Sequence, residues 1–304
     1  MNLKIAQKLP ITIVVLAIIA AVINGIIGFV RSESALETAA IEKIDAAHDG
    51  RISELTNYLN SVKEDVVLLA ENHMVIDAIK QLEDAYAELG PNAKNTLQKL
   101  YINDNPNKAG EKHKLDFAPD GSAYSTAHKK YHPWFRQVME ARGYYDIFLI
   151  NEFGKVVYSV YKEADYATDL VSGEWKDSDL AKMFTEANAN QKKDFIAFTD
   201  FKPYAPSAGV PASFIGVPVF EHGGEFHGVL VFQMPIDRIN KIMQLATGLG
   251  ETGETYLVGT DSLMRSTSRF TKKGETDILK TKAESEGVKK ALAGKDGTLV
   301  TIDR

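Results

Sequence analysis

The sequence predicts an α+β protein with an N-terminal transmembrane helix, a long signalling-type helix, and then antiparallel-sheet modules with helices on one face. Three observations predict it. Residues 9–30 are almost uninterruptedly apolar, residues 34–73 contain scarcely a helix breaker, and short strand patterns separated by turns begin at residue 145. Strands that follow one another in the sequence and pack against flanking helices are typical of the α+β class.

The apolar stretch 9–30 is long enough to cross a bilayer, which takes about 20 residues in one helix. Lys4 and Lys8 precede it, so the positive-inside rule predicts a cytoplasmic tail at residues 1–8 and places the chain after Arg31 outside. A cleaved signal peptide is the alternative, but its apolar region is usually about 7–15 residues long. We therefore expect a single-pass protein of the bacterial inner (cytoplasmic) membrane.

Residues 31–73 are predicted to form one long helix. Its apolar residues recur at alternating steps of three and four, which is the pattern of a coiled-coil seam. The seam comprises Ile52, Leu55, Leu59, Val62, Val66 and Leu69. Two interpretations are open: the seam packs only on the domain that follows, or part of it also pairs with the same helix of a second subunit in a homodimer.

The remaining elements follow from periodicity, turns and breakers. We expect helices at 74–89 and 92–102, a surface loop at 103–124, and a short helix at 132–143 with Pro133 in its first turn. Strands are predicted at 145–150, 155–160, 195–199, 212–220 and 226–234, with helices at 178–187 and 235–245. Another strand is predicted to begin at Gly297.

Composition limits the function. The net charge of −6 leaves no basic stripe to neutralise phosphates, so nucleic acid is excluded as a partner. The chain has no cysteine, which excludes disulfides, thiolate chemistry and Cys-ligated metal. Common hydrolase, zinc and phosphate-loop motifs are missing from the sequence. We expect no enzyme, no catalytic residue, no metal and no cofactor.

Two residue pairs bear on this expectation. Glu163 and Asp165 could form a carboxylate pair for acid–base work, but no nucleophile or oxyanion site stands beside them in the sequence. A membrane-anchored extracytoplasmic hydrolase is therefore the weaker alternative. His222 and His227 flank a glycine turn, where imidazoles are expected to be solvated rather than metal ligands.

Two segments between strands, 162–175 and 200–207, combine polar and aromatic residues as ligand pockets do. They predict a pocket for a small polar molecule, lined by residues around a single sheet. The candidate ligand-binding residues from these segments and the first strand are Tyr145, Asp146, Lys162, Asp165, Tyr166, Asp200 and Tyr204.

Several segments resemble a known family. Residues 144–150, 154–160 and 162–166 look like the first module of a double Cache (tandem PAS-like) sensor domain, the type found in bacterial methyl-accepting chemotaxis receptors. Residues 201–207 and 214–219 extend the match, and residues 250–266 resemble the start of the second module. The resemblance covers about residues 34–304. It implies a membrane-distal module at 74–246 and an incomplete membrane-proximal module at 247–304, as in a truncated gene product or fragment.

The resemblance also implies a function. The distal module would bind an unaltered small molecule, such as an amino acid, an amine or a carboxylate, and paired helices would relay binding to a chemotaxis kinase. The sensor of a histidine kinase or nucleotide cyclase is the alternative. An amino-acid-binding subset of the family uses an Arg–Trp–Tyr cluster and a later Asp. Tyr131 to Arg136 holds those residue types in another order, so Trp134 and Asp200 are the candidate counterparts.

Overall fold

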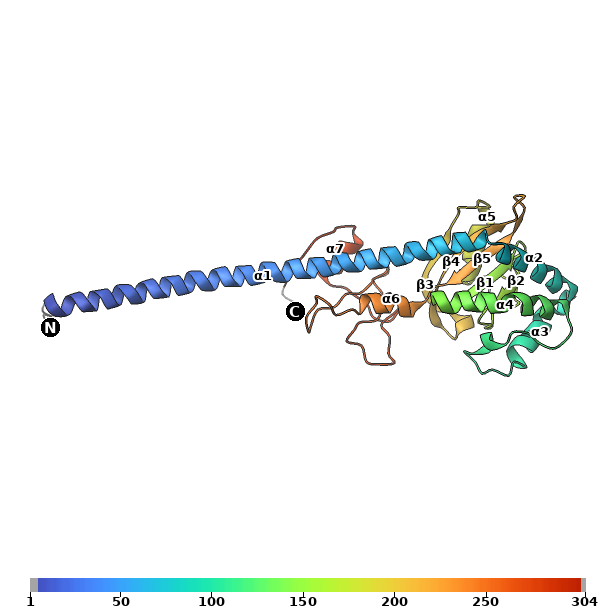
Figure 1. The fold of residues 1–304 in the computed structure, drawn as a ribbon, viewed down its shortest axis with the longest axis horizontal. Coiled ribbons are helices and arrows are strands. Elements are labelled where there is room, and N and C mark those ends of the chain that lie inside the picture. The colour runs from blue at the N-terminus through green and yellow to red at the C-terminus, as the bar shows by residue number, and fades with distance from the viewer. Residues whose placement is uncertain (1–4, 302–304) are drawn as a thin grey trace.

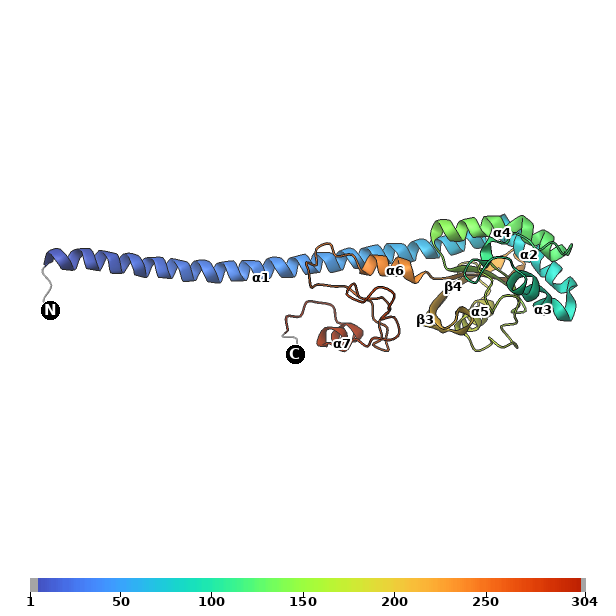
Figure 2. The same cartoon turned by 90° about the horizontal axis from the view of Figure 1, so that it is seen from below.

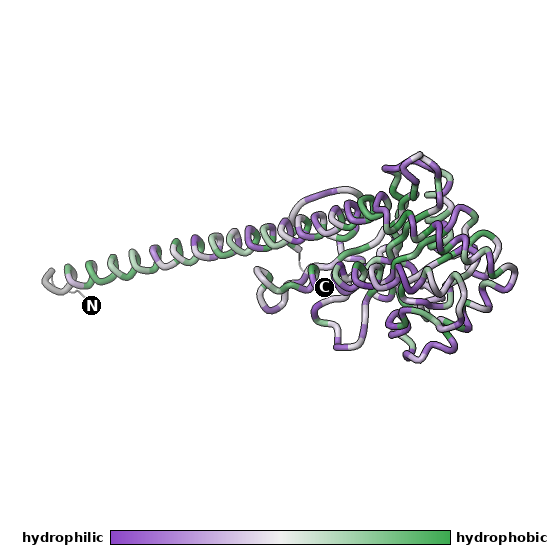
Figure 3. The backbone as a smooth tube through the Cα atoms, turned by 45° about the vertical axis from the view of Figure 1, so that its right-hand side comes forward, coloured by the Kyte–Doolittle hydropathy of each residue, from purple (hydrophilic) through white to green (hydrophobic). Residues whose placement is uncertain are grey.

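The computed structural model describes residues 5–301. Helix α1 (Ile5–Ala70) is one unbroken helix of 66 residues, about 100 Å long at 1.5 Å per residue, and it extends from the body of the protein as a rod (Figures 1 and 2). From Leu9 this helix is long and apolar enough to cross a membrane, a test that a signal sequence also passes. Its apolar end is exposed along residues 9–30 (Figure 3). Lys4, in the predicted tail, lies outside the described residues.

The distal part of α1 packs on the protein's own domain. Val62 and Val66 are fully buried in the main core, and Leu55 and Leu59 pack partly against it. Ile52, at the start of the predicted seam, is 50% exposed. Packing on the following domain is therefore confirmed for the seam beyond Ile52, while pairing with a second subunit stays a prediction.

Three α-helices lie between α1 and the first strand: α2 (His73–Glu88), α3 (Ala93–Gln98) and α4 (Ala123–Arg142). Short 3₁₀ turns lie at 90–92 and 112–114, and a π-helical turn lies at 99–103. The chain bends between α1 and α2, where the Asn72 side chain accepts a hydrogen bond from the Met74 N–H at 2.8 Å and caps α2.

The prediction of a short helix at 132–143 was wrong at its start. Helix α4 begins at Ala123, where the Ser122 side chain caps it by accepting the Ser125 N–H at 3.0 Å. Pro133 consequently lies inside the helix instead of in its first turn. Proline lacks only one N–H, and burial of the face that carries Tyr124 and Phe135 outweighs that loss. The predicted loop 103–124 ends only two residues earlier than expected, because the added helical residues come mainly from the stretch between that loop and His132.

Within the described residues, five strands form one antiparallel sheet in the order β2-β1-β5-β4-β3. The strands are β1 (Asp146–Asn151), β2 (Val156–Ser159), β3 (Ala197–Tyr204), β4 (Val210–Phe220) and β5 (Phe226–Gln233). The five predicted strands are confirmed, with one extension. Strand β3 continues through Asp200 to Tyr204, across an irregularity between Thr199 and Lys202, so part of the second predicted loop is strand.

The sheet is buried on both faces. Successive residues of a strand point to opposite faces, and in β1 Ile147 and Leu149 join the core with α1, α2 and α4, whereas Phe148 and Ile150 join the core with α5 (Asp179–Ala189). The α+β class is confirmed. The larger helices cover one face, and α5 with the loop that precedes it covers the other.

After α6 (Ile236–Met243) the chain is mainly irregular, apart from α7 (Glu286–Leu292) and isolated bridges such as Val258 with Met264. This segment runs beside the rod (Figures 1 and 2). Residues 297–301 are irregular, so the strand predicted to begin at Gly297 was wrong for the described part, and Ile302 lies outside it. Residues 297–301 do not pair with either edge of the five-stranded sheet.

Candidate ligand-binding site

Asp146 begins β1 on the face that carries Phe148 and α5. It is completely buried, and its Oδ1 accepts the backbone N–H groups of Ile147, Val160 and Tyr161 at 2.7–2.9 Å. These bonds tie the end of β2 to the start of β1. Its other oxygen, Oδ2, has no hydrogen-bond partner among residues 5–301.

Asp165 lies in the loop that follows β2 and is also completely buried. Its Oδ2 accepts the Tyr204 hydroxyl at 2.6 Å. The loop is closed locally, since the Thr168 N–H donates to the Asp165 carbonyl at 3.1 Å. The remaining carboxylate oxygen, Oδ1, is unpartnered within the part of the chain that the structure describes.

A third carboxyl and an amide complete this region. Tyr145 donates from its hydroxyl to Glu163 Oε1 at 2.9 Å, and Ser207 donates to the other oxygen of Glu163. The sheet register sets Gln233 of β5 directly opposite Asp146, so the two side chains share one face. Gln233 is 2% exposed, and its Oε1 finds no partner in the described chain.

We call Asp146, Glu163, Asp165, Tyr145, Tyr204 and Gln233 the acidic cluster. Burial raises the pKa of Asp146 well above its usual range, and the nearby charge of Asp165 adds to this. Burial also raises the pKa of Glu163 and raises that of Asp165 to about 7. Ionised carboxylates are expensive to bury without a cation. The arrangement therefore favours a group that brings positive charge and N–H donors.

Lys162 makes no hydrogen bond to the free oxygens of Asp146 and Asp165. It is buried with a left-handed backbone (φ 61°), and its Nζ donates to the Val160 carbonyl at 3.0 Å. The ammonium lies 3.4 Å from His132 Nδ1 on α4, and the Tyr158 ring centre is 5.8 Å away. Burial lowers the pKa of Lys162 to about 7, partly offset by attraction to Asp146.

The structure thus brings together four of the predicted residues: Tyr145, Asp146, Asp165 and Tyr204. Their role in binding stays a prediction. The other four lie elsewhere. Lys162 faces α4; Tyr166 is buried and donates to the Tyr124 hydroxyl at 2.9 Å; Trp134 packs edge-on to Phe135; and Asp200 pairs with Arg265 at 2.8 Å.

Sequence reasoning missed Gln233 and Ser207 and considered Glu163 only for catalysis. A signal for Gln233 was present. Gln233 is the last residue of the apolar strand 226–233. It lies two positions after Val231 and four after Val229, so it points to the same face of the sheet as these valines, which are buried beside α5. A polar residue on a buried face is informative because it needs a partner.

A cavity of about 1150 Å³ opens beside the acidic cluster. It lies between the end of the sheet, α1, α6 and the segment 267–278, and its lining includes Tyr145 and Gln233. Two residues of the cluster therefore border space that a small molecule can enter.

No protein-family model matches the chain, and no curated protein sequence matches it. Similar solved structures exist. One is the sensor domain of the histidine kinase DctB from V. cholerae, with a TM-score of 0.40 and 13% sequence identity. The matched region covers 67% of this chain and 59% of the DctB domain. The ligand-binding domain of the Pseudomonas aeruginosa PAO1 amino-acid chemoreceptor PctC, in complex with GABA, has a TM-score of 0.29 and 16% identity over 73% of this chain and 79% of its own.

The ligand-binding domain of the Campylobacter jejuni chemoreceptor Tlp3, in complex with 4-methylisoleucine, has a TM-score of 0.34 and 11% identity over 66% of this chain and 73% of its own. These similar structures are ligand-binding sensor domains of chemoreceptors and of a histidine kinase.

Proposed function

We propose that this chain is the extracytoplasmic sensor of a membrane-anchored bacterial chemotaxis receptor, and that it binds a small polar molecule carrying an ammonium group. Residues 9–30 would span the membrane, residues 74–246 would form the ligand-binding module, and residues 247–304 would begin a second module. The observation that carries the proposal is the set of buried acceptor oxygens without partners on Asp146, Asp165 and Gln233.

An ammonium group satisfies this set because it offers three N–H donors and a positive charge. A buried acceptor without a partner costs about 1–3 kcal/mol, so a ligand that pairs these oxygens recovers that cost on binding. A ligand with only carboxylates would meet Glu163 and Asp165 at close range and be repelled. Among the three ligand classes expected from the sequence, amines and amino acids are therefore favoured over simple carboxylates.

The signal would leave through α1. The buried seam residues Val62 and Val66 tie the rod to the core that lies against the sheet, and the rod continues without a break into the apolar span. Ligand closure over the acidic cluster would shift the balance between two arrangements of paired rods. The chain would bind its ligand without converting it.

A thermal-shift screen of the full chain in detergent tests the proposal, with amines, amino acids and carboxylates as probes. We expect an amine or amino acid to raise the melting temperature, because a ligand that binds only the folded state stabilises it. Chromatography of the probe after incubation should recover it unchanged. A screen without a hit, or conversion of the probe, would contradict the proposal.

Two variants locate the site. Asp165→Ala should weaken binding by about 2–5 kcal/mol, the cost of truncating one partner of a buried charge pair. Asp200→Ala serves as the comparison, because Asp200 is half-exposed and pairs with Arg265. Its affinity should stay within about twofold of wild type. Equal, negligible effects would mean that the ligand binds elsewhere.

A further inference from the structure

Two histidines far apart in the sequence meet at the bend between α1 and α2. His73 is the first residue of α2, and His222 lies in the turn between β4 and β5. Their Nε2 atoms are 3.1 Å apart, their ring centres are 4.4 Å apart, and the rings are tilted by 55°. Both side chains are exposed, so burial does not force the contact.

The geometry differs from that of a simple hydrogen bond. A head-on N–H···N bond at this distance would hold the ring centres about 5 Å or more apart, since each ring adds about 1 Å. The observed spacing is shorter, so the two rings do not meet head-on along the line that joins their Nε2 atoms. Two imidazoles bound to one metal ion at about 2.0–2.1 Å have their nitrogens about 2.9–3.4 Å apart, for angles between square and tetrahedral. The Nε2 separation lies in this range.

A carboxylate lies in the same part of the fold. Glu71, in the bend, lines the same hollow of about 160 Å³ as His222, together with Lys193 and apolar residues of α2 and β4. Glu71 is exposed, so its carboxylate is free to rotate toward the histidine pair.

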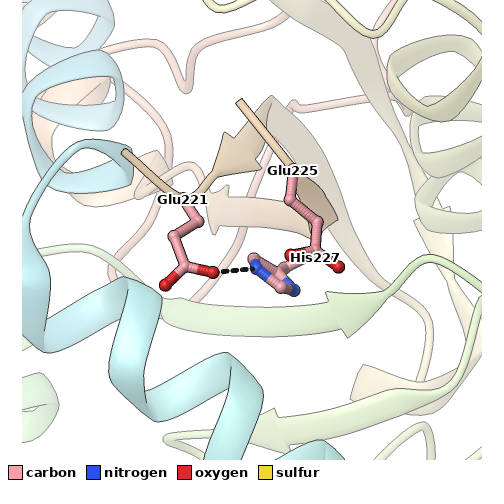
Figure 4. Close-up of side chains that lie close together, drawn as sticks. All are labelled: Glu221, Glu225 and His227. Carbon is pink, nitrogen blue, oxygen red and sulfur yellow. Dashed lines mark hydrogen bonds and ion pairs between the residues drawn. The ribbon is translucent and has the colours of Figure 1, made fainter. Parts of the chain in front are cut away.

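A second group of metal-ligand types occupies the same hairpin. One ligand atom from each of Glu221, Glu225 and His227 lies within 4.8 Å of the others (Figure 4). Lys80 already pairs with Glu221 Oε2 at 2.8 Å, and the same oxygen lies 3.3 Å from His227 Nε2. A metal here would have to displace the lysine. The histidine pair needs no such displacement and is the better site.

We propose that His73 and His222 bind a divalent transition metal of the kind that prefers imidazole, such as Zn²⁺, Ni²⁺ or Cu²⁺, through their Nε2 atoms. Glu71 supplies an oxygen ligand, and water completes the coordination. The ion joins the first turn of α2 to the β4–β5 turn. It therefore fastens the distal end of the rod to the sheet, independently of the acidic cluster.

The test uses the full chain in detergent, without a histidine tag and stripped with EDTA before dialysis. Zn²⁺ is titrated against a chromogenic chelator, and the melting temperature is measured with and without Zn²⁺. We expect one equivalent to bind and to raise the melting temperature. His73→Ala and His222→Ala should each weaken binding at least tenfold and remove the thermal shift.

His48→Ala and His227→Ala are the matched controls. His48 is exposed on α1, and His227 belongs to the neighbouring Glu221 group. Both variants should bind Zn²⁺ within twofold of wild type. The proposal is overturned if the wild-type chain does not bind Zn²⁺, if His73→Ala binds normally, or if His227→Ala abolishes binding, since the last result would assign the ion to the Glu221 group.

Discussion

At the residue scale, Asp165 is one of two fully buried carboxyl groups whose burial carries an electrostatic cost. Its carboxyl has an ordinary pKa near 4 in an unfolded chain, and burial raises the pKa to about 7 in the folded protein. The folded state therefore binds more protons than the unfolded state between about pH 4 and pH 7. The contribution of Asp165 to the free energy of unfolding is therefore fully present below about pH 4 and is lost as the pH rises through 7.

Asp165→Asn should remove the loss of stability that wild type shows as the pH rises. Asparagine keeps an oxygen that can accept the Tyr204 hydroxyl but cannot ionise. We expect the variant to be more stable than wild type at pH 8, by at most about 4 kcal/mol, and the difference to shrink toward pH 4. Urea unfolding at pH 4, 6 and 8 measures it. A difference that does not change with pH would mean that Asp165 titrates normally.

The proposed ammonium ligand at Asp165 leads to a prediction about the pH dependence of its affinity. An ammonium ligand prefers the ionised Asp165, so binding releases a proton when the solution is below pH 7. For a probe whose amine stays protonated, the dissociation constant should rise about tenfold between pH 8 and pH 6. Calorimetric titration in buffers of different ionisation enthalpy also counts the released proton. Asp165→Asn should flatten the profile, and an unchanged wild-type affinity would oppose ammonium recognition.

At the element scale, the pairing of β1 with β5 positions the site, because it brings Asp146 opposite Gln233. Gly228 is essential to this pairing. Its φ is +128°, and a Cβ there would lie 2.1 Å from the Ile150 carbonyl oxygen. Only glycine allows the two backbones to approach so closely.

Gly228→Ala should therefore destabilise the protein by more than about 2 kcal/mol. Gly223→Ala in the adjoining turn is the matched control, because a Cβ at Gly223 meets nothing within 4 Å. The control should lie within about 0.5 kcal/mol of wild type. Chemical denaturation measures both variants, and similar values for the two would contradict the role of the close approach.

At the scale of the whole molecule, a rod of 66 residues joins an apolar span to the body of the protein, with apolar side chains still exposed along it. Leu36, Ile44 and Ile52 are each at least 50% exposed and do not contact the core of their own domain. Exposed apolar residues on a helix of this length favour a partner helix. A second copy of the chain is the partner that we expect.

Single cysteines at successive positions from 36 to 52 test the homodimer, since the native chain has none. In membranes, disulfide cross-linking should peak about every 3.5 residues and include Ile44 or Ile52, because only the facing side of each rod comes close enough to react. Cysteines placed at the buried Val62 and Val66 should cross-link poorly. Uniform or absent cross-linking along the rod would argue against paired helices.

The sequence by itself determined the features that depend on neighbouring residues. The apolar span, the rod, the β1–β2 and β4–β5 hairpins and the helix after Pro235 follow from periodicity and turn residues within a few positions of one another. The loop after β2 was also identified as a place for buried polar residues. Four candidates from this loop, the first strand and the second loop, among them Asp146 and Asp165, lie together in the structure.

Tertiary structure alone decided the rest. Asp146 meets Gln233 because the register of two strands far apart in the sequence sets them opposite each other, and Asp200 leaves the predicted pocket because Arg265 pairs with it. His73 meets His222 only because the bend after α1 brings α2 against a hairpin. A pattern over a few residues specifies an element and its apolar face. The partner of a polar group depends on how distant elements pack, and no local periodicity encodes that contact.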